Sequence, residues 1–176
     1  AYLTEHWPEN VHIFTKNTVD CFTFPQLGCR VYGAAFTAAN APALLDGFAA
    51  APDELLDLMV LHGDALNAAS PYNAITPAQI AASGLAYLAL GHIHTQSGLL
   101  RAGDTCYAWP GCPMGRGFDE LGEKGVYLGL VGEGRCTLTF TPLGAPKYEI
   151  LRVAAGDDAL AAIEHALPAD TQNDIY

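Results

Sequence analysis

Short apolar runs, each closed by a glycine or a polar residue, recur along the chain and predict buried strands. The clearest runs are residues 55–61 and 85–90. Between them, residues 76–79 (Thr-Pro-Ala-Gln) combine a cap, a first-turn proline and a capping-box glutamine, and Gly84 follows as a helix end. The pattern therefore predicts a strand, a short helix and a second strand, although so short an apolar run does not by itself exclude a buried helix.

Further strands are predicted where β-branched and aromatic residues cluster or alternate with polar ones. They cover residues 18–24, 29–36, 105–109, 126–131, 135–141 and 147–153. The segments on either side of residues 132–134 are typical of a hairpin. Strands interleaved with few helices predict an α/β (α+β) fold class.

The last part of the chain predicts a separate helix. Asp157 or Asp158 can cap it, and Leu160, Ile163 and Leu167 lie on one helical face. The chain begins at Ala1 without a methionine and stops at Tyr176 without a polar tail, so we expect an excised fragment.

Composition narrows the class of protein. Of 176 residues, 51% are hydrophobic and 15% charged, which is typical of a globular domain with a sizeable core. No run approaches the ~18 apolar residues of a membrane span, and no signal peptide is visible. The five scattered cysteines suggest reduced thiols, so we expect a cytoplasmic location and no membrane partner. The net charge of −11 argues against a broad basic surface for nucleic acid.

Three histidines follow the two clearest strands. His62 ends the first, and His92 and His94 come directly after the second, beyond Gly91. Because the carboxyl ends of parallel strands meet at one edge of a sheet, these three side chains are expected to converge. Neutral imidazole binds zinc, manganese or iron. Asp64 is close in sequence but is expected to be structural or solvated.

Four motifs, in this order, resemble the later motifs of the calcineurin-like metallophosphoesterases. They are LHG at 61–63, GHIH at 91–94, YAWPG at 107–111 and GRGFDELGEKG at 115–125. The match is best with the bacterial DNA-repair exonuclease branch, related to the SbcD and Mre11 nucleases and including YhaO-like members. The resemblance identifies residues 1–153 as the C-terminal portion of such a catalytic domain and residues 154–176 as the truncated start of a following helical segment.

The resemblance implies part of a four-layer α/β/β/α sandwich with two divalent metal ions. Manganese is the expected metal, with zinc or iron as alternatives. By analogy, His62 and His92 bind one ion and His94 binds the other. Arg116 is a candidate phosphate contact, or equally a solvated loop arginine, and Glu120 is expected to set the loop conformation. The implied partners of the full-length protein are DNA, an ATPase subunit and a second copy of the chain.

The family's first three motifs do not occur before His62. They would supply the bridging aspartate, an asparagine ligand and the general-acid histidine, so we expect the fragment by itself to be inactive. The leading hypothesis is a di-metal DNA repair exonuclease. The alternatives are a phosphodiesterase for small phosphodiesters, a non-catalytic binding or scaffold domain on the same fold, and a zinc hydrolase with three histidine ligands.

Overall fold

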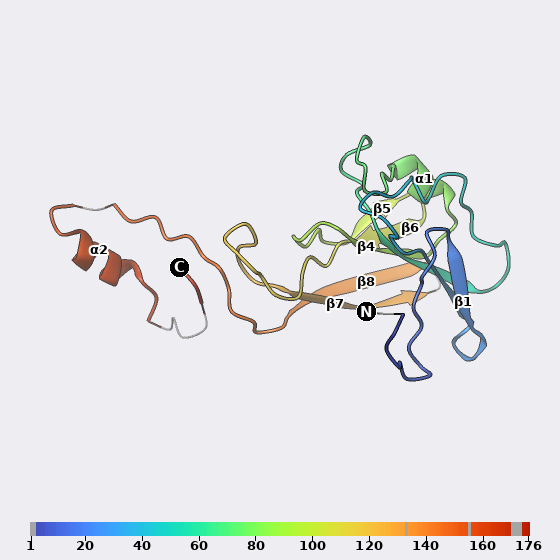
Figure 1. Ribbon diagram of the computed structural model, residues 1–176, viewed down its shortest axis with the longest axis horizontal. Helices are drawn as coiled ribbons and strands as arrows, with labels where there is room; N and C mark the ends of the chain where they lie inside the picture. The colour runs from blue at the N-terminus through green and yellow to red at the C-terminus, as the bar shows by residue number, and fades with distance from the viewer. Residues whose placement is uncertain (1–2, 133, 155, 170–173) are drawn as a thin grey trace.

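A computed structural model describes residues 3–132, 134–154, 156–169 and 174–176. Its centre is a six-stranded sheet in the order β1-β2-β3-β4-β6-β5 (Figure 1). Strands β2, β3, β4 and β6 run parallel, while β1 and β5 pair antiparallel at the two edges. The strands are β1 (Asp20–Phe24), β2 (Cys29–Gly33), β3 (Leu56–His62), β4 (Tyr87–Gly91), β5 (Leu100–Ala102) and β6 (Thr105–Ala108), with a 3₁₀ turn, η1 (Pro25–Leu27), after β1.

The strand–helix–strand unit predicted from the sequence is confirmed. Helix α1 (Pro77–Ala82) lies between β3 and β4, and Thr76 caps it. The Thr76 hydroxyl accepts a hydrogen bond from the Gln79 backbone N–H (3.2 Å), and the Gln79 side chain accepts one from the Thr76 N–H (2.8 Å). This reciprocal pair satisfies N–H groups that an uncapped helix would leave unpaired.

The core fills the face of the sheet that α1 covers. Alternate residues of β3 and β4 point into it, since successive side chains of a strand face opposite sides. The buried cluster contains Met59, Leu61, Leu88 and Leu90 from these strands, together with Leu45, Ile75, Ile80, Leu85 and Trp109. Residues 38–52 form a loop, which an isolated bridge between Ala41 and Tyr72 joins to the segment after β3.

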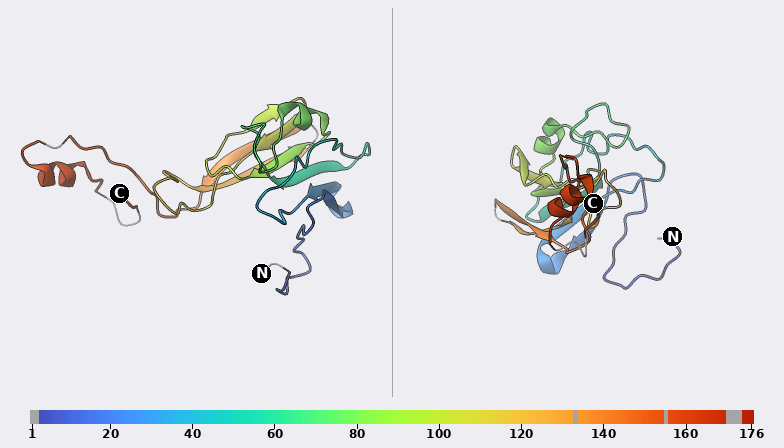
Figure 2. Two further views of the ribbon diagram at one scale, coloured as in Figure 1. Left: turned by 45° about the horizontal axis from the view of Figure 1, so that its top comes forward. Right: turned by 90° about the vertical axis from the view of Figure 1, so that its left-hand side faces the viewer.

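A second β layer covers part of the opposite face. The predicted hairpin is confirmed as β7 (Gly125–Gly132) and β8 (Arg135–Pro142) (Figure 2). Tyr127 of β7 donates a hydrogen bond to the Gln96 side chain (2.6 Å) and accepts one from the Gly98 N–H (2.7 Å). Over β3 this face is more open, and Val60 is 52% exposed.

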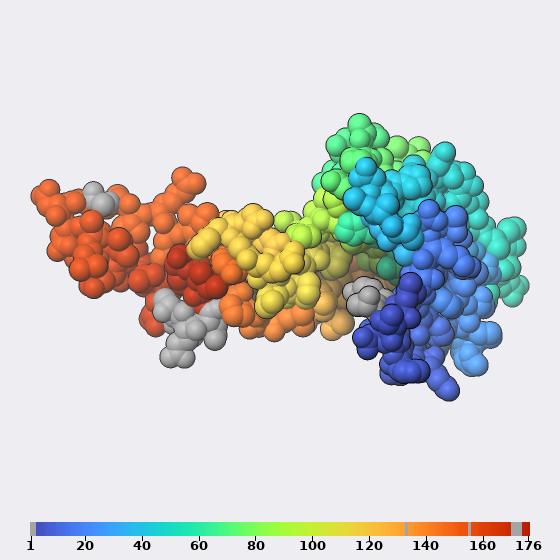
Figure 3. All heavy atoms as spheres, viewed as in Figure 1, coloured from blue at the N-terminus to red at the C-terminus, as the bar shows by residue number. Residues whose placement is uncertain are grey.

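The prediction of a strand over residues 147–153 is wrong. Among the described residues, this segment makes an isolated bridge between Tyr148 and Ile175, and its backbone bonds go to the C-terminal residues and to Gly122 and not to a strand of either sheet. Beyond it, Asp158 caps α2 (Ala159–Ala166), as predicted. The apolar face of α2 is exposed, since this part of the chain extends away from the sheets (Figures 1 and 3).

The architecture confirms the predicted mixed α/β class, with a mostly parallel sheet and few helices. The domain boundary at residues 153 and 154 stays a prediction, and residues 155 and 170–173 of the second segment lie outside the described residues. Neither helix in the described part of the chain has the length and apolarity of a membrane span.

Candidate metal centre

Two of the three predicted histidines meet at the carboxyl edge of the sheet. His62 is the last residue of β3 and pairs in register with Gly91, so His92 follows directly beside it. Nε2 of His62 lies 3.2 Å from Nδ1 of His92. Two imidazole nitrogens bound to one tetrahedral zinc at about 2.0–2.1 Å would be separated by roughly 3.3 Å. The donor chemistry and spacing of this histidine pair therefore fit a single divalent ion.

The backbone at this edge is unusual. His92 has φ +100°, a conformation that a side chain with a Cβ rarely adopts and that often marks functional sites. Gly91 leaves room for this approach, because a Cβ there would lie 3.2 Å from Nδ1 of His62 and would press on that ring. The small residue Gly91 and the strained backbone of His92 therefore allow the two imidazoles to lie close together.

Two buried polar side chains hold the backbone that carries the histidine pair. The indole N–H of Trp109, which is 1% exposed, donates to the carbonyls of Gly91 (3.0 Å) and Gly63 (3.2 Å). The Asn73 amide donates to the His62 carbonyl (2.9 Å), and its oxygen accepts from the Leu44 N–H (2.7 Å). These bonds fix the ends of β3 and β4 relative to each other.

The electrostatic setting keeps the His62 ring available as a ligand. Partial burial, and then the neighbouring His92 and His94, lower the pKa of His62, which favours the neutral imidazole that binds metal. An Asp64 carboxylate oxygen lies 3.9 Å from Nε2 of His92.

Asp64 has mainly a structural role. Burial would raise its pKa, but hydrogen bonds from the Leu66 N–H, the Ser70 hydroxyl and the Asn67 N–H outweigh burial and lower the pKa. The two backbone bonds measure 2.9 Å from Leu66 and 3.1 Å from Asn67. Of the two roles expected for Asp64, structural or solvated, this geometry agrees with the structural one, since Asp64 is buried in the turn after β3.

His94 belongs to a different group. Its Nδ1 forms a short hydrogen bond and ion pair with Oε1 of the buried Glu120, whose Oε2 accepts from the Arg116 N–H (2.8 Å). His94, Cys112 and Glu120, here called the His94 cluster, have ligand atoms that all lie within 4.8 Å of one another. The sequence analysis did not predict this grouping, because its members come from three separate segments with no metal-ligand spacing.

Arg116 and Glu120 lie where the glycine-rich loop turns. The Arg116 residue is exposed, and its backbone rather than its side chain contacts Glu120. Its assignment as a phosphate contact stays a prediction. Glu120 does fix the loop through the Arg116 N–H, as expected, and it contacts His94 as well, which was not expected.

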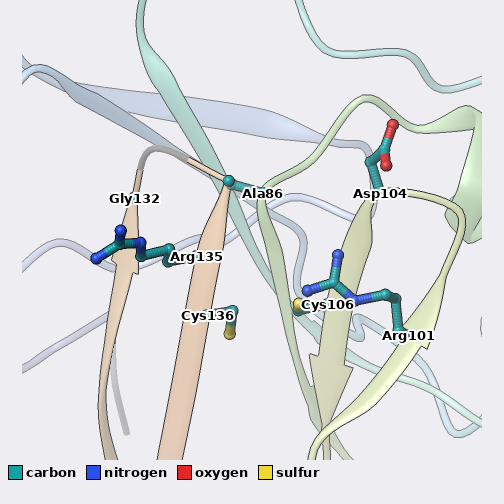
Figure 4. Close-up of a pocket in the computed structure, with 8 residues that line it drawn as sticks. Ala86, Arg101, Asp104, Cys106, Gly132, Arg135 and Cys136 are labelled. Carbon is teal, nitrogen blue, oxygen red and sulfur yellow. The ribbon is translucent and has the colours of Figure 1, made fainter.

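A groove adjoins the histidine pair, and a smaller cavity lies at the opposite ends of the strands. An apolar groove of about 520 Å³ runs beside His62 between the N-terminal segment and the open face of β2 and β3. A cavity of about 40 Å³ lies between the hairpin and the amino ends of β4 and β6 (Figure 4). Cys106 and Cys136 line this cavity, and burial together with the Cys106 thiol raises the pKa of Cys136 to about 11. A protonated thiol is a poor nucleophile, so the cavity does not resemble a reactive site.

The chain is similar to a known protein of the metallophosphoesterase class. No protein-family model matches the chain. The chain is 33% identical over 140 residues to the uncharacterized metallophosphoesterase YhaO of Bacillus subtilis (strain 168). The match covers 76% of this chain and 34% of the relative, so the chain spans about a third of that relative's length.

This similarity supports the metallophosphoesterase family for the chain, in agreement with the resemblance found in the sequence motifs. The six-stranded, mostly parallel sheet is consistent with the mixed fold of that family. Metallophosphoesterases depend on divalent metal, and this chain offers the histidine pair and the His94 cluster as candidate ligands. The assignment of His62, His92 and His94 to particular ions stays a prediction.

Proposed function

We propose that this chain supplies part of the centre of a di-metal phosphodiesterase, and that the full-length protein is a DNA repair exonuclease. The observation that carries the proposal is the 3.2 Å approach of Nε2 of His62 and Nδ1 of His92 at the carboxyl edge of a parallel sheet. Ligands of α/β proteins bind at this edge. The similarity to a metallophosphoesterase supports the same chemistry.

In this proposal His62 and His92 hold one ion and His94 holds a second, using the ring nitrogen that does not face Glu120. Manganese is the expected metal, with zinc or iron as alternatives. When bound, the ions would supply Lewis-acid stabilisation of the phosphodiester and lower the pKa of an attacking water. Three histidines are too few ligands for two ions, so we expect the chain by itself to be inactive.

The proposed partners are those of the full-length protein: DNA, an ATPase subunit and a second copy, in the cytoplasm. A second candidate substrate class is small phosphodiesters. It is favoured by the net charge of −11, because a strongly acidic surface opposes binding to the phosphate backbone of DNA. A non-catalytic binding or scaffold role on the same fold is the remaining alternative.

The decisive experiment uses the full-length gene product with manganese, assayed on DNA ends and on a small phosphodiester. His92→Ala should reduce hydrolysis at least about 100-fold, since even lost outer-shell contacts to a metal cost 10–100-fold. His165→Ala is the matched control, because this exposed histidine lies on α2, away from the sheet edge. Full activity of His92→Ala would contradict the proposal, and absence of hydrolysis by the unmutated protein would favour the scaffold role.

Calorimetry on the present chain adds a separate test. Manganese and zinc should bind weakly, because the histidine pair gives one ion only two ring nitrogens. Tight binding that is lost in His92→Ala would instead support the zinc site with three histidine ligands. DNA and small phosphodiester activities measured side by side then decide between the two substrate classes.

A further inference from the structure

Each imidazole of the histidine pair contacts a further aromatic side chain. The Phe36 ring lies edge-on to the His62 ring, with the ring centres 5.0 Å apart. The Tyr72 ring lies beside the His92 ring, with centres 5.2 Å apart and planes inclined at 39°. The two imidazole rings are 5.0 Å apart. Successive contacts therefore link four rings at the carboxyl edge of the sheet, and Tyr72 ends this series beside His92.

The backbone that carries Tyr72 is fixed. Tyr72 pairs with Ala41 in an isolated bridge, and its N–H donates to the Ser70 hydroxyl (3.3 Å). The next residue, Asn73, is fully buried and has φ +54°, in the left-handed region that residues other than glycine seldom occupy. The Asn73 amide donates to the His62 carbonyl (2.9 Å). The residue that holds the end of β3 thus also fixes the position of Tyr72.

The Tyr72 side chain does not fill the core. It is 40% exposed and lies outside the buried cluster. Its hydroxyl makes no hydrogen bond to any residue that the structure describes, whereas the hydroxyls of Tyr32 and Tyr127 both do. Loops held on a rigid scaffold commonly carry binding residues. An anchored aromatic ring that is exposed beside a candidate metal ligand is therefore available to a bound molecule.

The charge of the protein favours an aromatic contact with substrate over an ionic one. An Asp64 carboxylate oxygen lies 3.9 Å from Nε2 of His92, and the whole chain carries 19 acidic and 8 basic residues. Such a balance opposes the approach of phosphate. Affinity beyond the contacts of the phosphate with bound metal must then come from uncharged groups. Every nucleobase or aryl group has a π face that can stack on an aromatic side chain.

We propose that Tyr72 is a stacking platform for an aromatic ring joined to the phosphodiester, which makes aromatic phosphodiesters the preferred substrate class. The ring is a nucleobase or an aryl group, so DNA and small aryl phosphodiesters share this chemistry. The inference rests on the proposed function, because it takes the phosphate to lie at the histidine pair. Tyr72 does not touch the reacting atoms in this arrangement. It selects the substrate and orients it.

The test is calorimetric binding to the full-length gene product with manganese. The probes are thymidine 5′-monophosphate and 2-deoxyribose 5-phosphate, which differ in whether a base is attached. The base should strengthen binding at least about fivefold in the unmutated protein, which is the lower end of what one stacked base contributes. Tyr72→Ala and Tyr72→Leu should abolish this difference, whereas Tyr72→Phe keeps the ring and should preserve it. Leu66→Ala is the matched control, because it truncates a 72% exposed side chain in the same loop.

The sugar phosphate reports separately on the fold and on the phosphate site. Its affinity should be the same in every variant. An equal loss for both probes in Tyr72→Ala would show a structural role and overturn the proposal. A nucleotide that binds the unmutated protein no better than the sugar phosphate would overturn it as well.

Phenyl phosphate distinguishes the two sources of the ring. Affinity equal to that of the nucleotide would assign the platform to aryl groups in general, and weaker binding would assign it to nucleobases. Binding requires no turnover, so this test is separate from that of the proposed function. Absence of hydrolysis together with loss of the base effect in Tyr72→Ala would refute the proposed activity but support the platform. Hydrolysis without any base effect would do the reverse.

Discussion

The polar groups at the two ends of the central parallel strands are held in opposite ways. At the carboxyl ends, His62 and His92 lie at the surface with ring nitrogens 3.2 Å apart. At the amino ends, Arg30 is buried and donates to the Tyr32 hydroxyl at 2.8 Å. The Arg30 guanidinium also pairs with Asp53 and lies 3.7 Å from the buried Asp57.

The difference shows which end is free to do chemistry. Arg30 is bonded to Tyr32 and Asp53 within the fold, so the amino end is a structural network. At the carboxyl end, Nε2 of His62 and Nδ1 of His92 face each other, and a strained backbone at His92 positions them. Polar groups of either kind are compatible with the fold, but only the second kind is presented to a ligand.

Removing the indole N–H of Trp109, which holds the carboxyl ends of β3 and β4 together, should have the largest effect on stability. Trp109→Phe keeps an aromatic ring but removes the N–H that binds the Gly63 and Gly91 carbonyls. Both bonds from the indole would be lost, although the Gly91 carbonyl would still accept from the Gly63 N–H (3.3 Å), so the free energy of unfolding should fall by about 1–3 kcal/mol. Urea denaturation measures this change. Tyr107→Phe, in β6 two residues before Trp109, is the control and should change stability much less. Equal losses in the two variants would refute the anchoring role.

Relieving the backbone strain at His92 should change the free energy of unfolding less than Trp109→Phe does, and should raise it instead of lowering it. His92→Gly can adopt φ +100° without steric cost, whereas His92→Ala cannot, so the glycine variant should be more stable than the alanine variant by about 1 kcal/mol or more. Thermal and urea unfolding of both variants give the difference. At His94, which lacks a positive φ, the order should reverse, because glycine costs about 0.5–1 kcal/mol of backbone entropy.

A substitution at the amino end of the central strands, at Asp57, should change stability least, and the change should depend on pH. Burial, opposed by Arg30 and aided by Asp53, raises the pKa of Asp57, and its Oδ1 has no hydrogen-bond partner within the described residues. A carboxyl whose folded pKa exceeds its unfolded value of 3.8 holds a proton more tightly when folded. Its contribution to stability is therefore full below pH 3.8 and is lost as pH rises through the folded pKa.

Asp57→Asn should remove this loss, since the amide stays neutral at every pH. The variant should be more stable than the parent near pH 7 by no more than about 1 kcal/mol, and the difference should shrink toward pH 3.8. Urea midpoints measured from pH 4 to pH 7 test this. A variant less stable at pH 7 would mean that the attraction between Asp57 and Arg30 outweighs the cost of burial.

Local patterns were sufficient for much of the fold. The apolar runs predicted β3 and β4, and the capping box at Thr76 and Gln79 formed as its spacing indicated. The convergence of His62 and His92 also followed from sequence, because parallel pairing places the ends of neighbouring strands at one edge. These features depend on interactions within a few residues or on one topological rule.

Other features were decided only by tertiary contacts. Residues 147–153 have a strand-like composition, but the backbone bonds that the structure describes for them go to Gly122 and Ile175 and not to a strand of either sheet. The apolar face of α2 gave no sign that it would remain uncovered. Composition fixes which segments favour extended or helical backbone, whereas their partners depend on where the rest of the chain lies.

The His94 cluster shows the same division within the candidate site. The amino-acid sequence determined that a histidine follows β4 and that a glycine-rich polar loop comes later. Only the tertiary structure brought Cys112 and Glu120 to His94, because that contact depends on the path of two loops over the sheet edge. Strand-end chemistry can be read from spacing along the chain, but chemistry assembled by loops depends on packing between distant residues.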